Sequence, residues 1–275
     1  MIIDAHQHFW RPERGDYGWL TPDIAPLYRD FMPDDLQPHL RQHGIDGTIL
    51  VQAAPTPTET EFLLDIANKT PFVLGVVGWT DFAAKSAAID IAKLAKHPKL
   101  VGLRPMIQDI ADDDWMLRPD LTPAFEAMIQ CDLTFDALVL PRHLSKLAQL
   151  LSRHPRLRTV IDHGAKPNIS GGQFDDWAND IAVIAKESGA YCKLSGLLTE
   201  AGNDWDITDV APYVAHLLAH FGPERLVWGS DWPVLTMSAS YETWLNVTVS
   251  LIPDERARLA MLGSNAADLY RLSKR

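Results

Sequence analysis

Short apolar runs alternate with longer segments of helical periodicity along the whole chain. Eight runs are dominated by apolar residues, several of them on both faces, as is typical of strands in a covered parallel sheet; they are residues 2–5, 48–52, 72–79, 100–106, 133–139, 158–162, 190–195 and 226–229. Between them, apolar residues recur at helical spacing, and the pattern predicts helices over 33–42, 57–68, 83–96, 121–129, 144–154, 173–188, 210–221 and 254–262.

Eight strands that each precede a helix predict a (β/α)8 barrel, the TIM-barrel form of an α/β fold, as a single domain over residues 1–275. The alternative is a doubly wound sheet, which carries a glycine-rich phosphate loop after an early strand. The first strand runs instead into His6, Gln7 and His8, and no linker marks a domain boundary. Residues 11–31 and 108–119 are predicted as long loops on the catalytic face of the barrel.

Composition narrows the classes of partner. The chain of 275 residues has 25 Lys and Arg against 36 Asp and Glu, a net charge of −11, which disfavours nucleic acid and anionic membrane surfaces as partners. No apolar stretch approaches the roughly 18 residues of a membrane span, and the first residues do not resemble a secretory signal. Cys131 and Cys192 are expected to be reduced thiols, so we predict a cytoplasmic protein.

Polar residues stand where three of the predicted strands end. His6 and His8 lie two positions apart after the first strand, so both imidazoles face the same way and can hold a metal ion or a substrate oxygen. A hydrogen-bonded pair of histidines at the barrel mouth is the alternative. His163 follows the sixth strand, and Asp231 closes the eighth, where a buried carboxylate needs a partner unless it caps a following helical turn. Together these four residues predict one common site.

The chain resembles the amidohydrolase superfamily, in particular the branch that hydrolyses sugar lactones and lactones of aromatic degradation. The resemblance extends nearly from end to end and is carried by segments 4–10 (DAHQHFW), 162–167 (DHGAKP), 193–196 (KLSG), 229–233 (GSDWP) and 265–270 (NAADLY). It implies a (β/α)8 hydrolase of the L-fuconolactonase, L-rhamnonolactonase, sulfomuconolactonase or pyrone-dicarboxylate lactonase type.

The chain departs from the binuclear members of that superfamily. Those carry a bridging Lys or Glu at the fourth strand and a His at the fifth, whereas this chain has Arg104 and Asp136 in those regions. A centre with two metal ions is therefore not expected. Two alternatives stay open: no metal, or one divalent ion, most readily Zn²⁺, on His6, His8 and Asp231.

Lactone hydrolysis needs an activated water and a polarised carbonyl. Asp231 is the candidate general base, acting best with a pKa raised by partial burial, and His163 is the second catalytic candidate, with His6 and His8 around the carbonyl. Arg104 is a candidate substrate clamp, or else a buried ion pair with Asp136.

Further side chains are candidates for substrate binding. Lys193 is likewise a candidate substrate contact, or else a member of a buried ion pair. Gln52 and Asp136 are candidates for hydrogen bonds to hydroxyl groups of the substrate. Trp10 and Trp232 flank the catalytic candidates, and their rings suit the apolar face of a sugar. Trp79 and Trp115 are at least as consistent with packing.

The predicted function is opening of a sugar lactone, such as L-fuconolactone, L-rhamnonolactone or a related aldonolactone, to the aldonate. The alternatives are a lactone of aromatic degradation, a metal-dependent decarboxylase, which the missing histidine at the fifth strand disfavours, and a non-catalytic binding protein. The expected partner is a small-molecule lactone, and the oligomeric state is left open.

Overall fold

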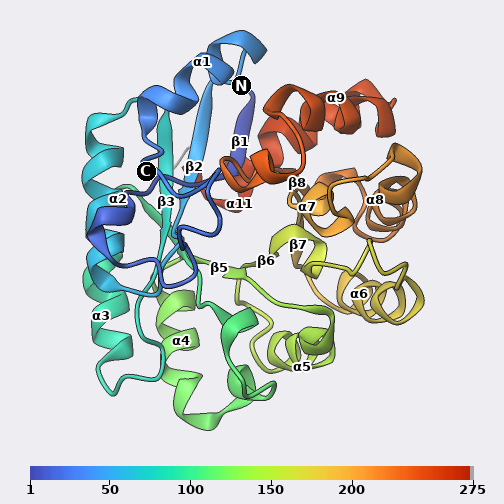
Figure 1. The fold of residues 1–275 in the computed structure, drawn as a ribbon. Coiled ribbons are helices and arrows are strands. Elements are labelled where there is room, and N and C mark those ends of the chain that lie inside the picture. Colours follow the sequence, from blue (N-terminus) through green and yellow to red (C-terminus); the bar gives the residue numbers. More distant parts are fainter. Residues whose placement is uncertain (273–275) are drawn as a thin grey trace.

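The computed structural model describes residues 1–272 and contains an eight-stranded parallel sheet in the order β1 to β8 (Figure 1). The strands are β1 (Ile3–Gln7), β2 (Gly47–Val51), β3 (Val73–Gly78), β4 (Leu100–Leu103), β5 (Thr134–Ala137), β6 (Thr159–Ile161), β7 (Tyr191–Leu194) and β8 (Leu226–Trp228). Each lies within or next to a predicted apolar run, and helices surround the strands in Figure 1. The predicted (β/α)8 barrel is confirmed.

The barrel closes just beyond the carboxyl ends of β8 and β1. Gln7 forms a parallel bridge with Trp232, the amide of Asp231 donates to the carbonyl of His6, and the amide of His8 donates to the carbonyl of Trp232, both over 2.8 Å. The backbone of the eighth strand is thus continued alongside the His6 to His8 segment. This closure brings Asp231 next to the two histidines, although 223 positions separate it from His8.

The helices fill the intervals between the strands. They are α1 (Pro33–His43), α2 (Pro57–Lys69), α3 (Ala87–Leu94), α4 (Thr122–Gln130), α5 (Leu144–Arg153), α6 (Asp175–Glu187), α7 (Leu197–Ala201), α8 (Ile207–Phe221), α9 (Tyr241–Leu251), α10 (Glu255–Leu259) and α11 (Asn265–Leu269). Among residues 1–272, none of these helices is long and apolar enough to cross a membrane.

Three helices of the structure, α7, α9 and α11, were not predicted from the sequence. The helix expected over 254–262 is divided into α10 and a π-helical segment (Ala260–Ser264), and α11 follows that segment. By contrast, α8 follows its predicted stripe: Val210, Val214, Leu217 and Phe221 are buried, and Gly222 ends the helix with φ +69°.

The barrel interior changes character along its axis. One apolar cluster contains Ile3, Ile49 and Val101 from the strands together with Leu269 and Tyr270 from the end of the chain, so α11 closes that side. A register shift in β1 falls between Asp4 and Gln7. Beyond this irregularity the interior becomes polar, and the functional candidates gather there.

Candidate active site

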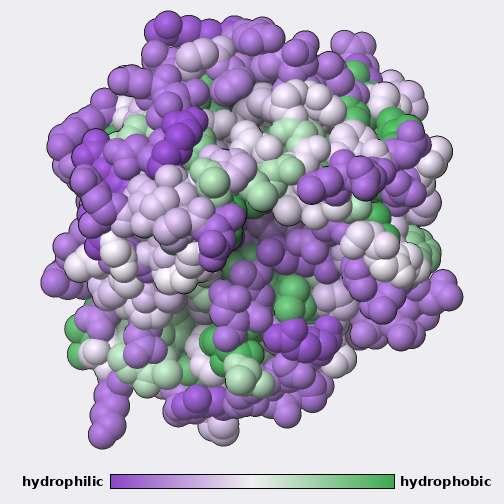
Figure 2. All heavy atoms as spheres, viewed as in Figure 1, coloured by the Kyte–Doolittle hydropathy of each residue, from purple (hydrophilic) through white to green (hydrophobic). Residues whose placement is uncertain are grey.

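A cavity of about 780 Å³ opens beside the carboxyl ends of the strands. Figure 2 shows a hollow near the middle of this face, with hydrophilic and hydrophobic residues around it. We call the part of its wall formed by His8, Arg104, His163, Lys166 and Asp231 the inner end of the cavity. The remaining wall is largely apolar and aromatic, and includes Trp19, Trp79, Phe82 and Trp115.

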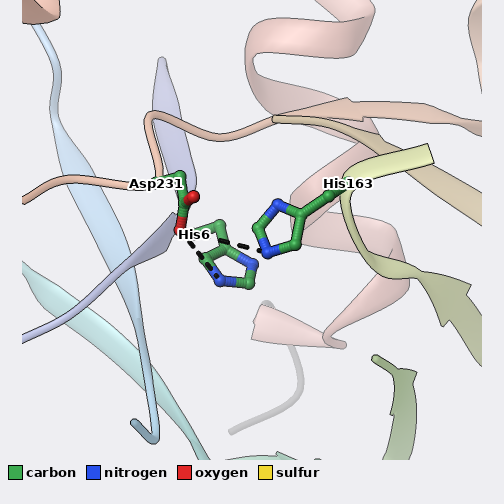
Figure 3. Close-up of side chains that lie close together, drawn as sticks. All are labelled: His6, His163 and Asp231. Carbon is green, nitrogen blue, oxygen red and sulfur yellow. Dashed lines mark ion pairs between the residues drawn. The ribbon is translucent and has the colours of Figure 1, made fainter. Parts of the chain in front are cut away.

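Three imidazoles surround one oxygen of Asp231. The carboxylate Oδ1 lies 3.3 Å from Nε2 of His8, 3.7 Å from Nε2 of His6 and 4.0 Å from Nε2 of His163. Figure 3 shows Asp231 with His6 and His163 and marks these two ion pairs. The predicted convergence of these four residues from three strand ends is therefore confirmed. Asp231 has φ +58°, a left-handed backbone that directs its side chain into this cluster instead of continuing the alternation of the strand.

The charge state of this cluster follows from its burial and its neighbours. Burial acts to raise the pKa of Asp231, but its three imidazole neighbours, His163 before the others, hold that pKa below its ordinary value. Burial lowers the pKa of His163 to about 4. At neutral pH, Asp231 is thus an anion and His163 a neutral ring. The expectation of a raised pKa for Asp231 was wrong, because the imidazoles outweigh the burial.

Behind the inner end lies a set of fully or almost fully buried charged side chains, Arg104, Asp136, Asp162 and Lys193, which we call the buried charge cluster. The Lys193 ammonium lies 2.5 Å from Asp136, 2.9 Å from Asp162 and 3.0 Å from Nδ1 of His6. Tyr270 donates to Asp136 over 2.7 Å. Lys193 and Asp136 have no exposed surface and do not line the cavity, so their predicted contact with substrate is not what the structure shows.

Arg104 joins the buried charge cluster to the cavity. Its guanidinium lies 3.2 Å from Asp162, not in the predicted ion pair with Asp136, and it donates to the backbone carbonyl of Gln52. The Gln52 amide donates back to the carbonyl of Arg104 over 2.8 Å. Gln52 is fully buried and holds Arg104 instead of reaching the cavity, which corrects the prediction that it contacts substrate. Arg104 itself does line the cavity, as predicted.

Comparisons with known proteins agree with this geometry. The family model described as Amidohydrolase matches residues 3–272. The chain belongs to the amidohydrolase family.

Two curated relatives match over nearly full length. An L-fucono-1,5-lactonase of Burkholderia ambifaria is 47% identical, with 99% of this chain and 96% of the relative covered. An L-fucono-1,5-lactonase of Burkholderia multivorans is 34% identical, with the same coverage. A crystal structure of a Burkholderia multivorans amidohydrolase with bound zinc superposes with a TM-score of 0.93 at 33% identity, over 98% of this chain and 99% of the other.

The residues around Asp231 have the donor atoms that a divalent cation binds. Of residues 1–272, His6, His163 and Asp231 form a group whose ligand atoms all lie within 4.8 Å of one another. The predicted set contained His8 in place of His163, and Nε2 of His8 is also close, 3.2 Å from Nε2 of His6. Two imidazole nitrogens and a carboxylate oxygen are a common donor set for zinc.

The hydrogen bond of His8 supplies a second observation about a cation. Its Nδ1 donates to the carbonyl of Val51 over 2.7 Å, so Nε2 of the neutral ring is an acceptor. That nitrogen faces the carboxylate oxygen of Asp231 at 3.3 Å. Two acceptors at this distance repel each other unless a proton or a cation lies between them. The residues present therefore fit a bound divalent ion.

Trp10 and Trp232, the two tryptophans predicted to contact substrate, are packing residues in the structure. Trp10 is fully buried and donates to the carbonyls of Leu27 and Arg29, so it fastens the loop that follows β1. Trp232 packs edge-on against Phe9 and Phe31. Neither ring lines the cavity, which corrects the prediction that they contact substrate, because the loop over residues 11–31 folds back onto them.

The cavity wall contains tryptophans that were not predicted to contact substrate. Trp79 and Trp115 line it, as does Trp19, whose indole donates to the carbonyl of Ala53. Lys166 was also overlooked, although it stands in the DHGAKP segment three positions after His163. That spacing from a catalytic candidate was the one signal in the sequence that points to it.

Proposed function

We propose that this amidohydrolase hydrolyses 1,5-lactones of sugar acids, with L-fucono-1,5-lactone as the first candidate substrate, to the open-chain aldonates. One structural observation carries the proposal: an ionised Asp231 stands among three imidazoles at the inner end of a cavity. The 47% identical L-fucono-1,5-lactonase, matched over nearly its whole length, supports the choice of substrate.

The proposed reaction uses Asp231 as the base. Water attacks the ring carbonyl carbon and gives up a proton to the Asp231 carboxylate; the bond between that carbon and the ring oxygen then breaks, and the ring oxygen takes a proton to become a hydroxyl group. The product is the aldonate and one proton. Because its pKa is low, Asp231 is ionised and ready to accept the proton at neutral pH, although it is a weaker base than a carboxylate with a raised pKa.

The neutral histidines orient the reacting groups. Nδ1 of His163 lies 2.9 Å from the hydroxyl of Ser195, which fixes the ring so that Nε2 faces Asp231. A divalent cation held by His6, His163 and Asp231, with His8 beside them, would polarise the lactone carbonyl as a Lewis acid.

The aromatic wall suits a sugar ring. Trp19, Trp79 and Trp115 present flat apolar surfaces to the cavity, on which the C–H face of a lactone ring packs. A 6-deoxy sugar acid adds a methyl group, which gains from burial against such a wall. This favours 6-deoxy aldonolactones over their 6-hydroxy counterparts.

A pH-indicator assay of proton release tests the proposal. The panel comprises L-fucono-1,5-lactone, an L-rhamnonolactone, a 6-hydroxy aldonolactone and 4-sulfomuconolactone, each with spontaneous hydrolysis subtracted. We expect hydrolysis of the sugar lactones, fastest for the 6-deoxy compounds. Hydrolysis of 4-sulfomuconolactone alone would move the substrate to the aromatic class, and no turnover of any compound before or after zinc addition would refute the proposal.

A further inference from the structure

The segment after β6 is a left-handed turn of four residues. His163, Gly164, Ala165 and Lys166 have φ values of +54°, +58°, +62° and +51°. Three of the four carry a side chain that disfavours this conformation, at a cost of order 1 kcal/mol each or more. Such a turn persists only where its surroundings enforce it.

Several contacts enforce this one. The amide of Lys166 donates to the carbonyl of His163 over 2.9 Å, and the indole of Trp177 on α6 donates to the carbonyl of Gly164 over 2.7 Å. Ala165 is fully buried, and Pro167 follows directly. The turn places His163 and Lys166, three positions apart, on the same cavity wall.

The charge of Lys166 is unusual for this cavity. Among residues 1–272, Arg104 and Lys166 are the only lysine or arginine residues in its wall, against the four carboxylates of Asp16, Asp81, Asp109 and Asp231. The Arg104 guanidinium is engaged by Asp162 and Gln52. The Lys166 ammonium has one recorded partner, Glu200 at 3.7 Å, and its side chain keeps 25% of its surface exposed. Of these two cations, Lys166 is therefore the one whose N–H groups are available to a ligand.

Glu200 forms an ion pair with this ammonium but does not occupy all its hydrogen-bond donors. It lies near the end of α7, a helix that was not predicted from the sequence, and its side chain is 26% exposed. The distance of 3.7 Å is that of an ion pair and not of a short hydrogen bond. The three ammonium hydrogens thus remain available to a ligand in the cavity.

We propose that Lys166 is a further catalytic residue, whose ammonium binds the lactone carbonyl oxygen and then the carboxylate of the aldonate. This inference rests on the proposed function. Attack by water turns the carbonyl oxygen into an anion. Ring opening then leaves a carboxylate on the product, and Asp231, ionised again once the ring oxygen has taken its proton, repels that carboxylate. A cation on the wall beside His163 offsets that repulsion at the place where negative charge develops.

The test compares Lys166→Met, which removes the charge and keeps the length, with Lys166→Arg, which keeps the charge. Turnover is measured on the best lactone of the panel. Calorimetry measures binding of two ligands: the corresponding aldonate, and the 1,5-anhydroalditol, a neutral ring that lacks the carbonyl oxygen. All three proteins are assayed at equal zinc content, and their thermal melting is recorded.

For Lys166→Met we expect kcat/KM to fall about 10²-fold and the Kd of the aldonate to rise at least about tenfold, with the Kd of the anhydroalditol changed less than about twofold. Lys166→Arg should recover part of both losses. Unchanged aldonate binding in Lys166→Met, or an equal loss for both ligands, would overturn the inference.

If Lys166→Met fails to fold, Lys166→Arg is the deciding variant. Aldonate affinity within about tenfold of the wild type that falls with added salt supports the role of Lys166. Affinity that is insensitive to salt overturns it. Failure of the proposed function is a separate result. In that case the wild-type protein itself neither opens a lactone nor binds an aldonate.

Discussion

The buried charge cluster and the inner end of the cavity contain the same kinds of side chain in adjacent places, yet they differ in how those side chains are partnered. In the cluster, Lys193 lies within 2.9 Å of two carboxylates, and none of the three has exposed surface. At the inner end, Asp231 faces three imidazoles at 3.3 to 4.0 Å, and Lys166 has one partner at 3.7 Å.

This difference separates stability from chemistry. Charges whose close partners are buried with them resist the loss of any one partner, because the other charge would then be buried and unpaired, and they offer no exposed atom to a ligand. Charges with loose or missing partners are costly to the folded state, and a ligand or a reacting group supplies what they lack. The same reasoning identifies Arg104 as the boundary, since it is paired with Asp162 and still reaches the cavity wall.

The largest effect on activity is expected for Asp231→Asn. Loss of the proposed base should lower kcat/KM about 10³-fold. Asn is one of the residues that accept a left-handed backbone, so the φ of +58° is retained, and the free energy of unfolding should change by no more than about 1 kcal/mol. Steady-state kinetics and urea denaturation measure the two quantities on the same preparation.

The matched control is Asp268→Asn, which removes an exposed carboxylate on α11 far from the cavity and should leave both quantities unchanged. Activity of Asp231→Asn within about tenfold of the wild type would transfer the role of base to another group. A large loss of stability would instead place Asp231 with the structural charges.

Lys193→Met should produce the opposite pattern. It leaves Asp136 and Asp162 buried without their ammonium, and removal of one partner from a buried ion pair typically costs about 3 to 5 kcal/mol. We therefore expect a loss of that size in urea denaturation. The double variant Lys193→Met, Asp136→Asn should recover part of it, because one of the two stranded charges is then gone.

An unchanged unfolding free energy in Lys193→Met would contradict the structural interpretation of the cluster. Equal losses in the single and the double variant would show that packing, not charge, is what the substitution disturbs. Residual activity of folded Lys193→Met, measured at low temperature, separates the two regions further, since Lys193 does not line the cavity and reaches its inner end through His6 and Asp162.

The fold and the position of the site were predictable from the sequence because both depend on local patterns. Apolar runs mark strands, and a polar residue at the end of such a run, as at His163 and Asp231, marks the face where all strands end. The closed order of strands then brings them together. Helix α9 escaped prediction because Thr243, Val247 and Thr248 favour extended structure, although Val247 and Thr248 lie on its buried face.

The partners of individual charges were not predictable in this way. Arg104 directly follows β4 and Asp162 directly follows β6, and their side chains meet in the barrel interior. Several inward-facing side chains lie there at a similar depth. Periodicity gives the face of a side chain but not its neighbour across the barrel. For the same reason Trp10 and Trp232 were assigned to the substrate, since nothing local shows that the loop over residues 11–31 returns to cover them.

The smallest expected effect on activity concerns Glu59 on α2, a buried carboxylate that belongs to neither region. Its oxygens accept the amides of Ala53 and Ala54 over 2.9 Å, and burial raises its pKa to about 8. Since that pKa exceeds the ordinary value of 4.5, the folded state holds the proton more tightly than the unfolded state. The resulting stability is complete below about pH 4.5 and is lost as the pH rises through 8.

Glu59→Gln removes this titration, and Glu61→Gln, an exposed neighbour on the same helix, is its matched control. Between pH 5 and pH 8.5 the wild type and Glu61→Gln should lose about 4 kcal/mol of unfolding free energy relative to Glu59→Gln, as measured by urea denaturation at each pH. Parallel curves for all three proteins would mean that the two amides keep Glu59 ionised throughout. A buried carboxylate would then need neither a cation nor a cavity to hold its charge, and the contrast between the two regions would depend on the number of donors and not on their sign.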